Sequence, residues 1–526
     1  MVLGGWLLLA IAIRKPSATR VICAAALLGA ATALKPTNAL HTVAAGVLVL
    51  MRPGSVSGKL RFTAIYGIAL GIAFTFVTAP WSYRLAERFG NPFFPLLNNV
   101  FRSPEFTTEP LHHLRFVPSS LAEALWRPFA MFDPVPMVHE ELRAPDIRYA
   151  VLLILACILL LQWGWKRVTA SPEPARSVAS PIDTRILAGL GCAVAVDWVA
   201  WLKASGNGRY FLPVACVSAV VIVGLLWKVC AARPKVRNYA ILAIFAGQAL
   251  QLWMGTDFRW VGVPWDGGQW FQVEVPEKLA TEPNLYLSMG IQSNSFVAPY
   301  LARGAGLINF VGGYPLTAIA ANRRKVESLI DRFGTHLRLL AYGERLYPDS
   351  ELRSPRVSDV NAALQQFGLR AEPADCQRIT IHGLPPQLEI TVGSAKVANR
   401  GPPYTSYLVT CAVTRDDASL PTDAARRQAI DLVFDHLEEA CPELFQPRRL
   451  PTDVRGDFAE RIYMNTDLTA WISHGWLKFV DPIPQLGDEL KFLGRASDWE
   501  KAPLHLECGR RGGHYFARVL DVSGGR

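Results

Sequence analysis

Two short polar turns between apolar stretches carry the residues best suited to bind an anion. The first turn holds Lys35 and Asn38, and the second holds Arg209 and Tyr210. A cation in an apolar stretch is costly unless it lies near an end or faces a polar cavity, so it marks a functional site in a membrane protein. Anchoring at the headgroup level is the alternative for the Lys, Arg and Tyr side chains. We interpret the two turns as parts of a phosphate-binding site at one membrane face.

Acidic residues near these turns are candidates for a general base. Asp197 lies inside an apolar stretch, where a carboxylate must be paired, protonated or directed into a cavity. A structural ion pair with a nearby cation is the alternative for this residue. The polar stretch at residues 81–148 supplies further titratable groups, although each is individually more typical of a solvated loop. These groups are Glu105, Glu109, His112, His113, Asp133, Glu140 and Glu141.

The apolar stretches that would position these residues lie in the first half of the chain. With 51% hydrophobic residues, the 526-residue chain is too apolar for one soluble domain. We expect a polytopic α-helical membrane domain of about eight transmembrane segments in residues 1–254. The segments are residues 1–13, 21–34, 36–51, 62–80, 149–163, 186–202, 211–227 and 239–254.

Basic residues indicate the orientation of these segments. They gather in alternate loops, at residues 14–20, 52–61, 166–185 and 228–237, which the positive-inside rule assigns to the cytoplasm. The same loops explain the net charge of +10, so the basic composition reflects topology and gives no nucleic-acid signal. Residues 255–526 are then expected outside the cytoplasm.

The expected outer loop at residues 81–148 opens after Pro80 with aromatic residues and Arg84. Residues 89–99 combine Gly, Pro, Asn and aromatic rings, a mixture typical of a loop on a membrane surface, with Asn91 in water. Residues 119–132 place apolar side chains on one helical face, which predicts a short interfacial helix.

Beyond an aromatic linker at residues 260–270, residues 255–385 alternate between strand and helix patterns. This alternation predicts an exported α/β domain with a small parallel sheet and crossover helices. The glycines in this part do not form a G-x-G-x-x-G motif after a strand, so we exclude nucleotide binding. The expected strands are residues 284–289, 306–311, 336–342 and 377–382, and the expected helices are 295–302, 323–333 and 357–367.

Residues 386–526 follow a different pattern and are expected to form a small exported α+β subdomain. Antiparallel strands are expected at 388–392 and 407–413, a helix at 422–440, and a Trp-rich segment at 462–480. Four cysteines of the exported part allow three disulfide pairings, which the sequence leaves open. None has zinc-ligand spacing, so no metal ligands are predicted. These cysteines are Cys376, Cys411, Cys441 and Cys508.

The start of the chain enters an apolar run at Met1, without a polar leader or a cleavage site. Either the first segment is short, or an N-terminal part precedes Met1. We keep both expectations.

Three motifs together resemble the polytopic bacterial glycosyltransferases of the GT-C superfamily. They are Lys-Pro-Thr-Asn at 35–38, Gly-Asn-Pro-Phe-Phe-Pro at 90–95 and Asn-Gly-Arg-Tyr-Phe-Leu-Pro at 207–213. The resemblance covers roughly residues 1–382. It implies a multi-pass protein of the bacterial cytoplasmic membrane that transfers a sugar from a polyprenyl-phosphate donor to a glycan, lipid or protein acceptor at the outer face.

The resemblance also implies roles for particular residues. Lys35, Arg209 and Tyr210 match positions that hold the lipid phosphate, and Arg84 is a further candidate for this role. Expected substrate contacts of the outer loop are Asn38, Asn91, His112 and His113. No cofactor is implied with certainty, and the resemblance leaves room for a divalent cation.

The chain departs from the family pattern at the catalytic base. In this superfamily the base usually lies in the first outer loop, which is upstream of the chain if Met1 falls inside a later helix. Asp197 or an acidic residue between Glu105 and Glu141 would then have to act as the base, with Asp197 and Glu105 as the named candidates, or the chain is an incomplete or inactive copy.

Two other functions compete with glycosyl transfer. A flippase or transporter of lipid-linked saccharides would usually show internal repeats, and no second copy of the Lys35 hairpin is found. A membrane-anchored protein of envelope assembly would carry its function in the exported part.

Overall fold

A computed structural model describes most of the chain, and it separates into two compact units. The first unit comprises Met1–Phe94, His112–Arg259 and Arg511–His514; the second comprises Pro95–Leu111, Trp260–Arg510 and Tyr515–Arg526. The described residues are 1–133, 135, 137–141, 144–169, 182–255, 272–289, 294–311, 319–342, 360–361, 363–382, 405–416, 424–445, 451–455, 458–480 and 491–520.

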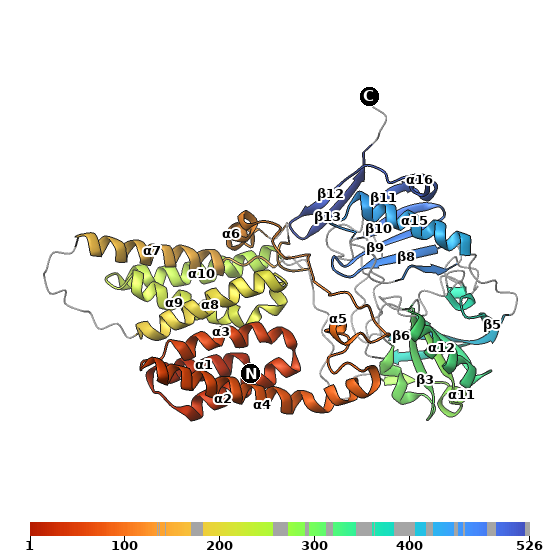
Figure 1. Ribbon diagram of the computed structural model, residues 1–526, viewed down its shortest axis with the longest axis horizontal. Coiled ribbons are helices and arrows are strands. Elements are labelled where there is room, and N and C mark those ends of the chain that lie inside the picture. The colour runs from red at the N-terminus through yellow and green to blue at the C-terminus, as the bar shows by residue number, and fades with distance from the viewer. Residues whose placement is uncertain are drawn as a thin grey trace. The chain divides into compact units, whose positions relative to one another are not determined.

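The first unit is helical, and Figure 1 shows α1 to α4 gathered together and α7 to α10 gathered together. Contacts between α3 and α8 join the two groups. The helices are α1 (Val2–Arg14), α2 (Ala18–Leu34), η1 (Pro36–Asn38), α3 (Ala39–Leu50), α4 (Val56–Phe89), α6 (Leu121–Ala130), α7 (Arg148–Thr169), α8 (Thr184–Ala204), η2 (Gly208–Tyr210), α9 (Leu212–Val229) and α10 (Pro234–Gly255).

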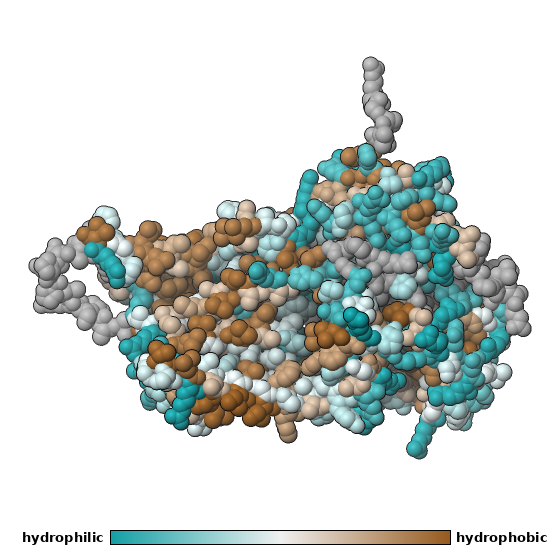
Figure 2. All heavy atoms as spheres, viewed as in Figure 1, coloured by the Kyte–Doolittle hydropathy of each residue, from teal (hydrophilic) through white to brown (hydrophobic). Residues whose placement is uncertain are grey.

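Four of the described helices are long and apolar enough to cross a membrane. They are α4, residues Arg148–Trp165 of α7, α8 and α9, whereas α1, α2 and the η1–α3 segment are apolar but shorter. The helical, apolar character of the first half is therefore confirmed, and the expected number of about eight spans is not. Figure 2 shows apolar residues gathered over the helical part on the face in view, which is compatible with a membrane protein.

The helix α4 extends beyond the expected end of its segment. Pro80 lies inside α4, which continues to Phe89 and ends at Gly90 with a left-handed φ of 66°. The expectation that a loop begins after Pro80 is wrong, and Trp81 and Arg84 are helical. The reason is that neighbouring residues in an apolar helix can compensate for the hydrogen bond that proline cannot donate.

Small residues allow the helices of this unit to approach one another closely. A Cβ added at Gly29 of α2 would lie 2.4 Å from the carbonyl oxygen of Leu70 in α4, and one at Gly224 of α9 would lie 2.5 Å from Leu187 Cδ1 in α8. Such contacts between small residues and a neighbouring backbone are typical of helix packing in membranes.

The second unit is rich in strands and contains a six-stranded sheet in the order β1-β5-β6-β4-β2-β3. Only β2, β3 and β4 pair in parallel, because β5 and β6 join as an antiparallel pair and β1 pairs antiparallel with β5. The small parallel sheet that the sequence predicted is therefore present as β2 to β4, but it forms part of a larger, mixed sheet. The strands are β1 (Gln272–Glu274), β2 (Leu285–Met289), β3 (Gly306–Val311), β4 (Leu337–Tyr342), β5 (Leu369–His382) and β6 (Thr405–Arg415).

The expected domain boundary between residues 385 and 386 does not coincide with a break in this sheet. Strand β6 lies beyond the boundary, yet it occupies a central place between β5 and β4. The helix expected at 323–333 is α12 (Ala320–Phe333), whereas the helix expected at 295–302 is the 3₁₀ turn η3 (Ser295–Tyr300). The short helices α5 (Asn98–Phe101) and α11 (Glu277–Thr281) also belong to this unit.

A five-stranded antiparallel meander forms the rest of the second unit, with a two-stranded pair, β12–β13. Helix α15 buries Phe434 and Leu437, and α16 buries Trp499, in a core shared with the meander. The elements are α15 (Ala424–Ala440), β7 (Asp453–Arg455), β8 (Phe458–Tyr463), β9 (Leu468–Ser473), β10 (Trp476–Val480), β11 (Lys491–Arg495), α16 (Ala496–Lys501), β12 (Leu506–Arg511) and β13 (His514–Val519).

Two disulfides resolve the pairing that the sequence left open. Cys376 bonds Cys411, its register partner across β5 and β6, and Cys441 at the end of α15 bonds Cys508 on β12. Disulfides of this kind persist in oxidising compartments. The linker expected at 260–270, the strand expected at 388–392 and part of the helix expected at 357–367 lie outside the described residues.

Candidate functional site at the turn between α8 and α9

The turn between α8 and α9 is held in shape by close contacts. Gly206 has a φ of 60°, and a Cβ at this position would lie 2.0 Å from the carbonyl oxygen of Phe116, so glycine is needed here. The indole of Trp201 donates a hydrogen bond of 2.7 Å to the Asn207 carbonyl, and Asn207 Oδ1 accepts one of 3.0 Å from the Arg209 amide. These hydrogen bonds therefore hold the backbone just before η2 in one conformation.

A buried pair of His41 on α3 and Asp197 on α8 lies directly behind this turn. His41 Nδ1 is 2.7 Å from Asp197 Oδ2, and both side chains are 0% exposed. The other ring nitrogen, Nε2, lies 2.8 Å from the carbonyl oxygen of Tyr210. Trp6 of α1 donates a further hydrogen bond of 3.1 Å to the His41 carbonyl. The pair thus links the turn to three helices.

The contacts of His41 fix one hydrogen of its ring. The Tyr210 carbonyl can only accept, so Nε2 of His41 carries a hydrogen, and Nδ1 faces the Asp197 carboxyl group. Because Asp197 is fully buried and bonded to His41, it is not placed to take a proton from an acceptor. We assign it a positioning role, in place of the catalytic role expected from the sequence.

The exposed side chain of Lys35 lies against the same turn. Its Nζ atom is 4.8 Å from the centre of the Tyr210 ring, a cation–π contact. Lys35 follows the last residue of α2 and precedes η1, whose Asn38 donates a hydrogen bond of 2.8 Å to the Ala31 carbonyl. Two residues that were expected to bind phosphate, Lys35 and Tyr210, therefore lie in contact.

An apolar groove of about 420 Å³ is lined by residues from the start of α1, the end of α2, η1 and the start of α9. Lys35 and Tyr210 are not among its lining residues, although Leu34 and Leu212 lie close to them in the chain. Its wall is almost entirely apolar, which suits a hydrocarbon chain. The lining residues are Met1, Val2, Leu3, Ala31, Leu34, Asn38, Leu212, Pro213 and Cys216.

The segment at residues 139–141 also contacts the turn, although Glu141 lies 66 residues before Asn207 in the chain. Glu141 Oε1 accepts hydrogen bonds of 2.9 Å from Asn207 Nδ2 and 2.5 Å from Arg209, whose side chain is 60% exposed. The amide of Gly208 donates one of 2.6 Å to the His139 carbonyl. Arg209 therefore already holds a carboxylate, whereas it was expected to hold a lipid phosphate.

Two titratable groups of this segment have shifted pKa values. The pKa of Glu140 is raised to about 7, chiefly by burial and also by the neighbouring Glu141, while Arg209 opposes the shift. A Cβ on Gly208 would lie 2.6 Å from Glu140 Oε1, so this carboxyl group rests directly on the turn. Burial lowers the pKa of His139 to about 4, and its ring is therefore neutral at pH 7. Glu140 is the carboxyl group at the turn that changes charge near neutral pH.

Arg84 and Asn91 have partners at the end of α4 and just after it. Arg84 is exposed on α4 and pairs with Glu87 on the same helix at 3.2 Å. Asn91 is buried, and its Oδ1 accepts a hydrogen bond of 2.9 Å from the Phe93 amide. The structure therefore gives Asn91 a role in shaping the chain after α4 and does not place it as a substrate contact.

Three further candidates, Glu105, His112 and His113, lie in the chain between α5 and α6. Glu105 belongs to the second unit, where it is largely buried and pairs with Lys325 at 2.7 Å. Glu105 therefore has a structural partner within the second unit. His112 and His113 are exposed in the polar stretch that precedes α6.

Sequence reasoning missed His41 and did not single out Glu140 and Glu141. A lone histidine inside the apolar segment 36–51 was a usable signal, because an ionisable residue there needs a partner. The two glutamates were recognised only as members of a loop with many titratable residues. Their pairing with residues 207–209 depends on a contact between distant segments.

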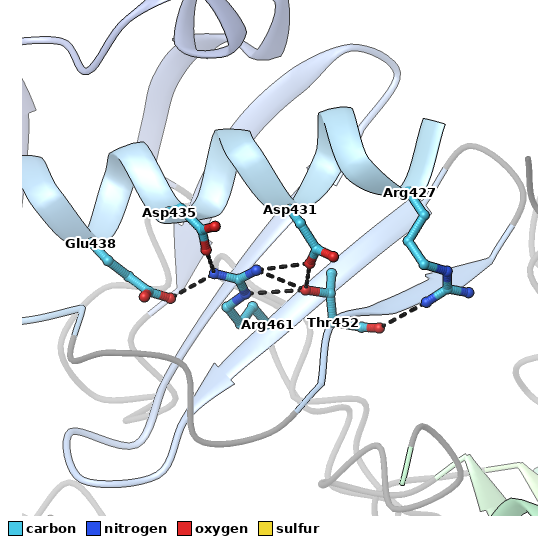
Figure 3. A network of polar contacts seen from close by, with 6 residues as sticks. All are labelled: Arg427, Asp431, Asp435, Glu438, Thr452 and Arg461. Carbon is cyan, nitrogen blue, oxygen red and sulfur yellow. Dashed lines mark hydrogen bonds and ion pairs between the residues drawn. The ribbon is translucent and has the colours of Figure 1, made fainter. Parts of the chain in front are cut away.

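A second polar cluster lies in the second unit, around the fully buried Arg461 (Figure 3). Its guanidinium is 2.9 Å from Asp431, 2.7 Å from Asp435 and 2.8 Å from Glu438, all on one face of α15. Thr452 Oγ1 accepts a further hydrogen bond of 2.9 Å from Arg461. Burial raises the pKa of Glu438, although Arg461 opposes this shift. The cluster fastens α15 to β8 and is a structural network.

Among the described residues, no group of three or more His, Cys, Asp or Glu side chains could hold a metal ion. Comparison with known proteins finds no matching family model, no similar curated protein and no similar solved structure. The class that the fold defines is therefore a helical, membrane-compatible unit joined to a strand-rich unit.

Proposed function

We propose that this chain is a membrane glycosyltransferase of the GT-C type. It transfers a sugar from a polyprenyl-phosphate donor to an acceptor at the outer face of a bacterial cytoplasmic membrane. The observation that carries the proposal is the exposed ammonium of Lys35 against the Tyr210 ring, together with an apolar groove lined by Leu34 and Leu212, which lie close to these two residues in the chain.

The combination of a cation and an apolar groove favours an amphiphilic anion as the ligand. The groove offers apolar surface to a hydrocarbon chain, while Lys35 offers a charge-assisted hydrogen bond to a phosphate. A neutral lipid would not use the charge of Lys35.

The reaction would develop charge at the position of Lys35. When the sugar leaves a lipid phosphate, negative charge grows on the phosphate oxygens, and a fixed cation lowers the energy of that transition state. Arg209 can join Lys35 only if the phosphate replaces Glu141 as its partner. Lys35 is therefore the first phosphate contact in this proposal, and Arg209 is the second.

We assign deprotonation of the acceptor to Glu140. General-base catalysis works best when the pKa lies near the working pH, and the pKa of Glu140 is about 7. Glu140 also rests on the turn that carries Arg209 and Tyr210. Asp197, held by His41, would keep the Tyr210 backbone in position.

The proposed topology also counts as spans the shorter helices α1, α2 and α3 and the 22-residue helix α10. With these four added to the four long helices, the basic loops fall on one side of the membrane. The second unit then lies outside the cytoplasm, which suits its two disulfides.

The experiment is turnover by the purified protein in lipid vesicles. A panel of labelled polyprenyl-phosphate sugars is supplied with candidate acceptors, and free polyprenyl phosphate is measured. We expect release by the wild type and a loss of at least about tenfold in Lys35→Gln, because a hydrogen bond to a charged group contributes about 1.5–3 kcal/mol.

Lys235→Gln is the matched control, because Lys235 is an exposed lysine in the first turn of α10, beyond the far end of α9 from Tyr210. It should release polyprenyl phosphate at the wild-type rate. Equal rates in Lys35→Gln and the wild type would contradict the site. Movement of intact donor across the vesicle membrane without release would favour a transporter.

A further inference from the structure

The short helix α6 exposes apolar residues where a helix that faces water would expose polar ones. Its exposed residues are all apolar: Leu121 is 76% exposed, Leu125 is 68% exposed and Trp126 is 63% exposed, and Ala122 completes the face. At 100° per residue these positions form one continuous face. We call these four residues the α6 outer face.

The charged residues of α6 point the other way. Arg127 is 1% exposed, and its guanidinium pairs with Glu123 at 2.6 Å. It also donates hydrogen bonds to the carbonyls of Phe116, at 3.0 Å, and Val138. Arg127 therefore points inward and is paired with Glu123, and the four residues of the α6 outer face offer no polar side chain to water. Such a face is costly in water but stable in an apolar surrounding.

The surroundings of α6 favour lipid as that apolar environment. Helix α6 packs against α7, whose exposed residues include Ile154, Leu160 and Leu161. Just after α6, the Phe132 carbonyl accepts a hydrogen bond of 3.4 Å from Gln251, near the end of α10. The α6 outer face therefore lies at the ends of two apolar helices, the level at which tryptophan and amphipathic helices meet a bilayer.

We propose that the α6 outer face docks into the headgroup and acyl boundary of a lipid bilayer. The inference concerns a surface of the first unit and does not depend on glycosyl transfer. Docking would also fix the site, because Arg127 holds the Val138 carbonyl, directly before the segment that contacts the turn. The helix would thereby hold Glu140 and Glu141 at a constant depth relative to the membrane.

Site-directed spin labelling tests the proposal on the full chain in phospholipid vesicles. The five free cysteines, Cys23, Cys157, Cys192, Cys216 and Cys230, are first replaced by alanine, and both disulfides are kept. A label at Leu125→Cys should collide with oxygen more than with a water-soluble nickel complex. Val220→Cys, on the exposed side of α9, and Lys501→Cys, on the exposed end of α16, are the membrane and water references.

Two outcomes would overturn the proposal. A label at Leu125 that is as accessible to nickel as the label at Lys501 would mean that the face is in water. A label shielded from both reagents would mean that protein covers the face. Leu121→Cys repeats the measurement at a second exposed position, so that one poorly folded variant does not decide the outcome.

Hydrogen exchange tests the link from α6 to the site. In Leu121→Ser/Leu125→Ser, exchange of the Gly208 amide should be at least about threefold faster, because the segment that accepts its hydrogen bond loses its anchor. Val220→Ser should leave this exchange unchanged. Equal exchange in all three proteins would contradict the anchoring role of the docked face.

Discussion

At the scale of residues, Tyr210 is the point where the contacts of the candidate site converge. Its carbonyl accepts from the buried His41, and its ring lies against the exposed Lys35. The preceding residue, Arg209, binds Glu141. One residue thus connects the buried His41–Asp197 pair to the exposed Lys35, so substitutions at His41 or Asp197 should affect the position of Tyr210 against Lys35.

Glu140 should give the protein a recognisable dependence on pH. A carboxyl group with its folded pKa raised from 4.5 to about 7 contributes stability at low pH that is lost as the pH rises from about 4.5 through about 7. Glu140→Gln should remove this loss and be more stable than the wild type above pH 7. Thermal unfolding in detergent at pH 5 and pH 8 measures the difference.

Comparison with the wild type at each pH removes the opposite contribution of His139, which both proteins share. Glu87→Gln is the control, because Glu87 is exposed on α4. A pH dependence that is the same in Glu140→Gln and the wild type would rule out this account of the carboxyl group.

Replacing Arg461 should lower the stability of the second unit more than most single substitutions. Its replacement by methionine leaves the carboxylates of α15 without their cation, and breaking a buried ion pair costs about 3–5 kcal/mol. Asp435→Asn should cost under about 1 kcal/mol, because Asp435 is 57% exposed. Hydrogen exchange of β8 and β9 in the full chain measures both effects, and equal effects would contradict the network.

At the scale of elements, the close approach of α2 and α4 depends on Gly29. A methyl group at this position would meet the backbone of Leu70, so Gly29→Ala should destabilise the helical unit by about 1–3 kcal/mol. Gly71→Ala on α4 should be neutral, because nothing lies within 4 Å of the added carbon. Thermal unfolding followed by circular dichroism compares the two, and equal shifts would contradict this packing.

The sequence predicted local elements better than their partners. Hydrophobic pattern located α6, α8, α9, α12 and β2 to β4, because each depends mainly on its own residues. The mixed sheet was not predictable, since the place of β6 is set by pairing with β4 and β5. The same limit applies to the site. Lys35 and Tyr210 were identified from their residue types, whereas the importance of His41, Glu140 and Glu141 became visible only through their contacts with distant segments.

At the scale of the whole molecule, a helical unit with long apolar helices is joined to a strand-rich unit with two disulfides. The proposed arrangement assigns donor binding to the helical unit. The second unit, which has its own buried core and polar network, is free to contribute to acceptor binding. A membrane site fed by lipid-linked donors needs no soluble nucleotide sugar, and no nucleotide-binding motif is found in the sequence.

The most direct test of the central claim is binding of polyprenyl phosphate to the purified protein in nanodiscs, measured by native mass spectrometry. The wild type and Lys235→Gln should bind it alike, and Lys35→Gln should bind it at least about tenfold more weakly. The uncharged polyprenol should bind weakly to all three proteins. If the wild type binds polyprenol and polyprenyl phosphate equally well, or if Lys35→Gln retains full affinity, the proposed phosphate site is wrong.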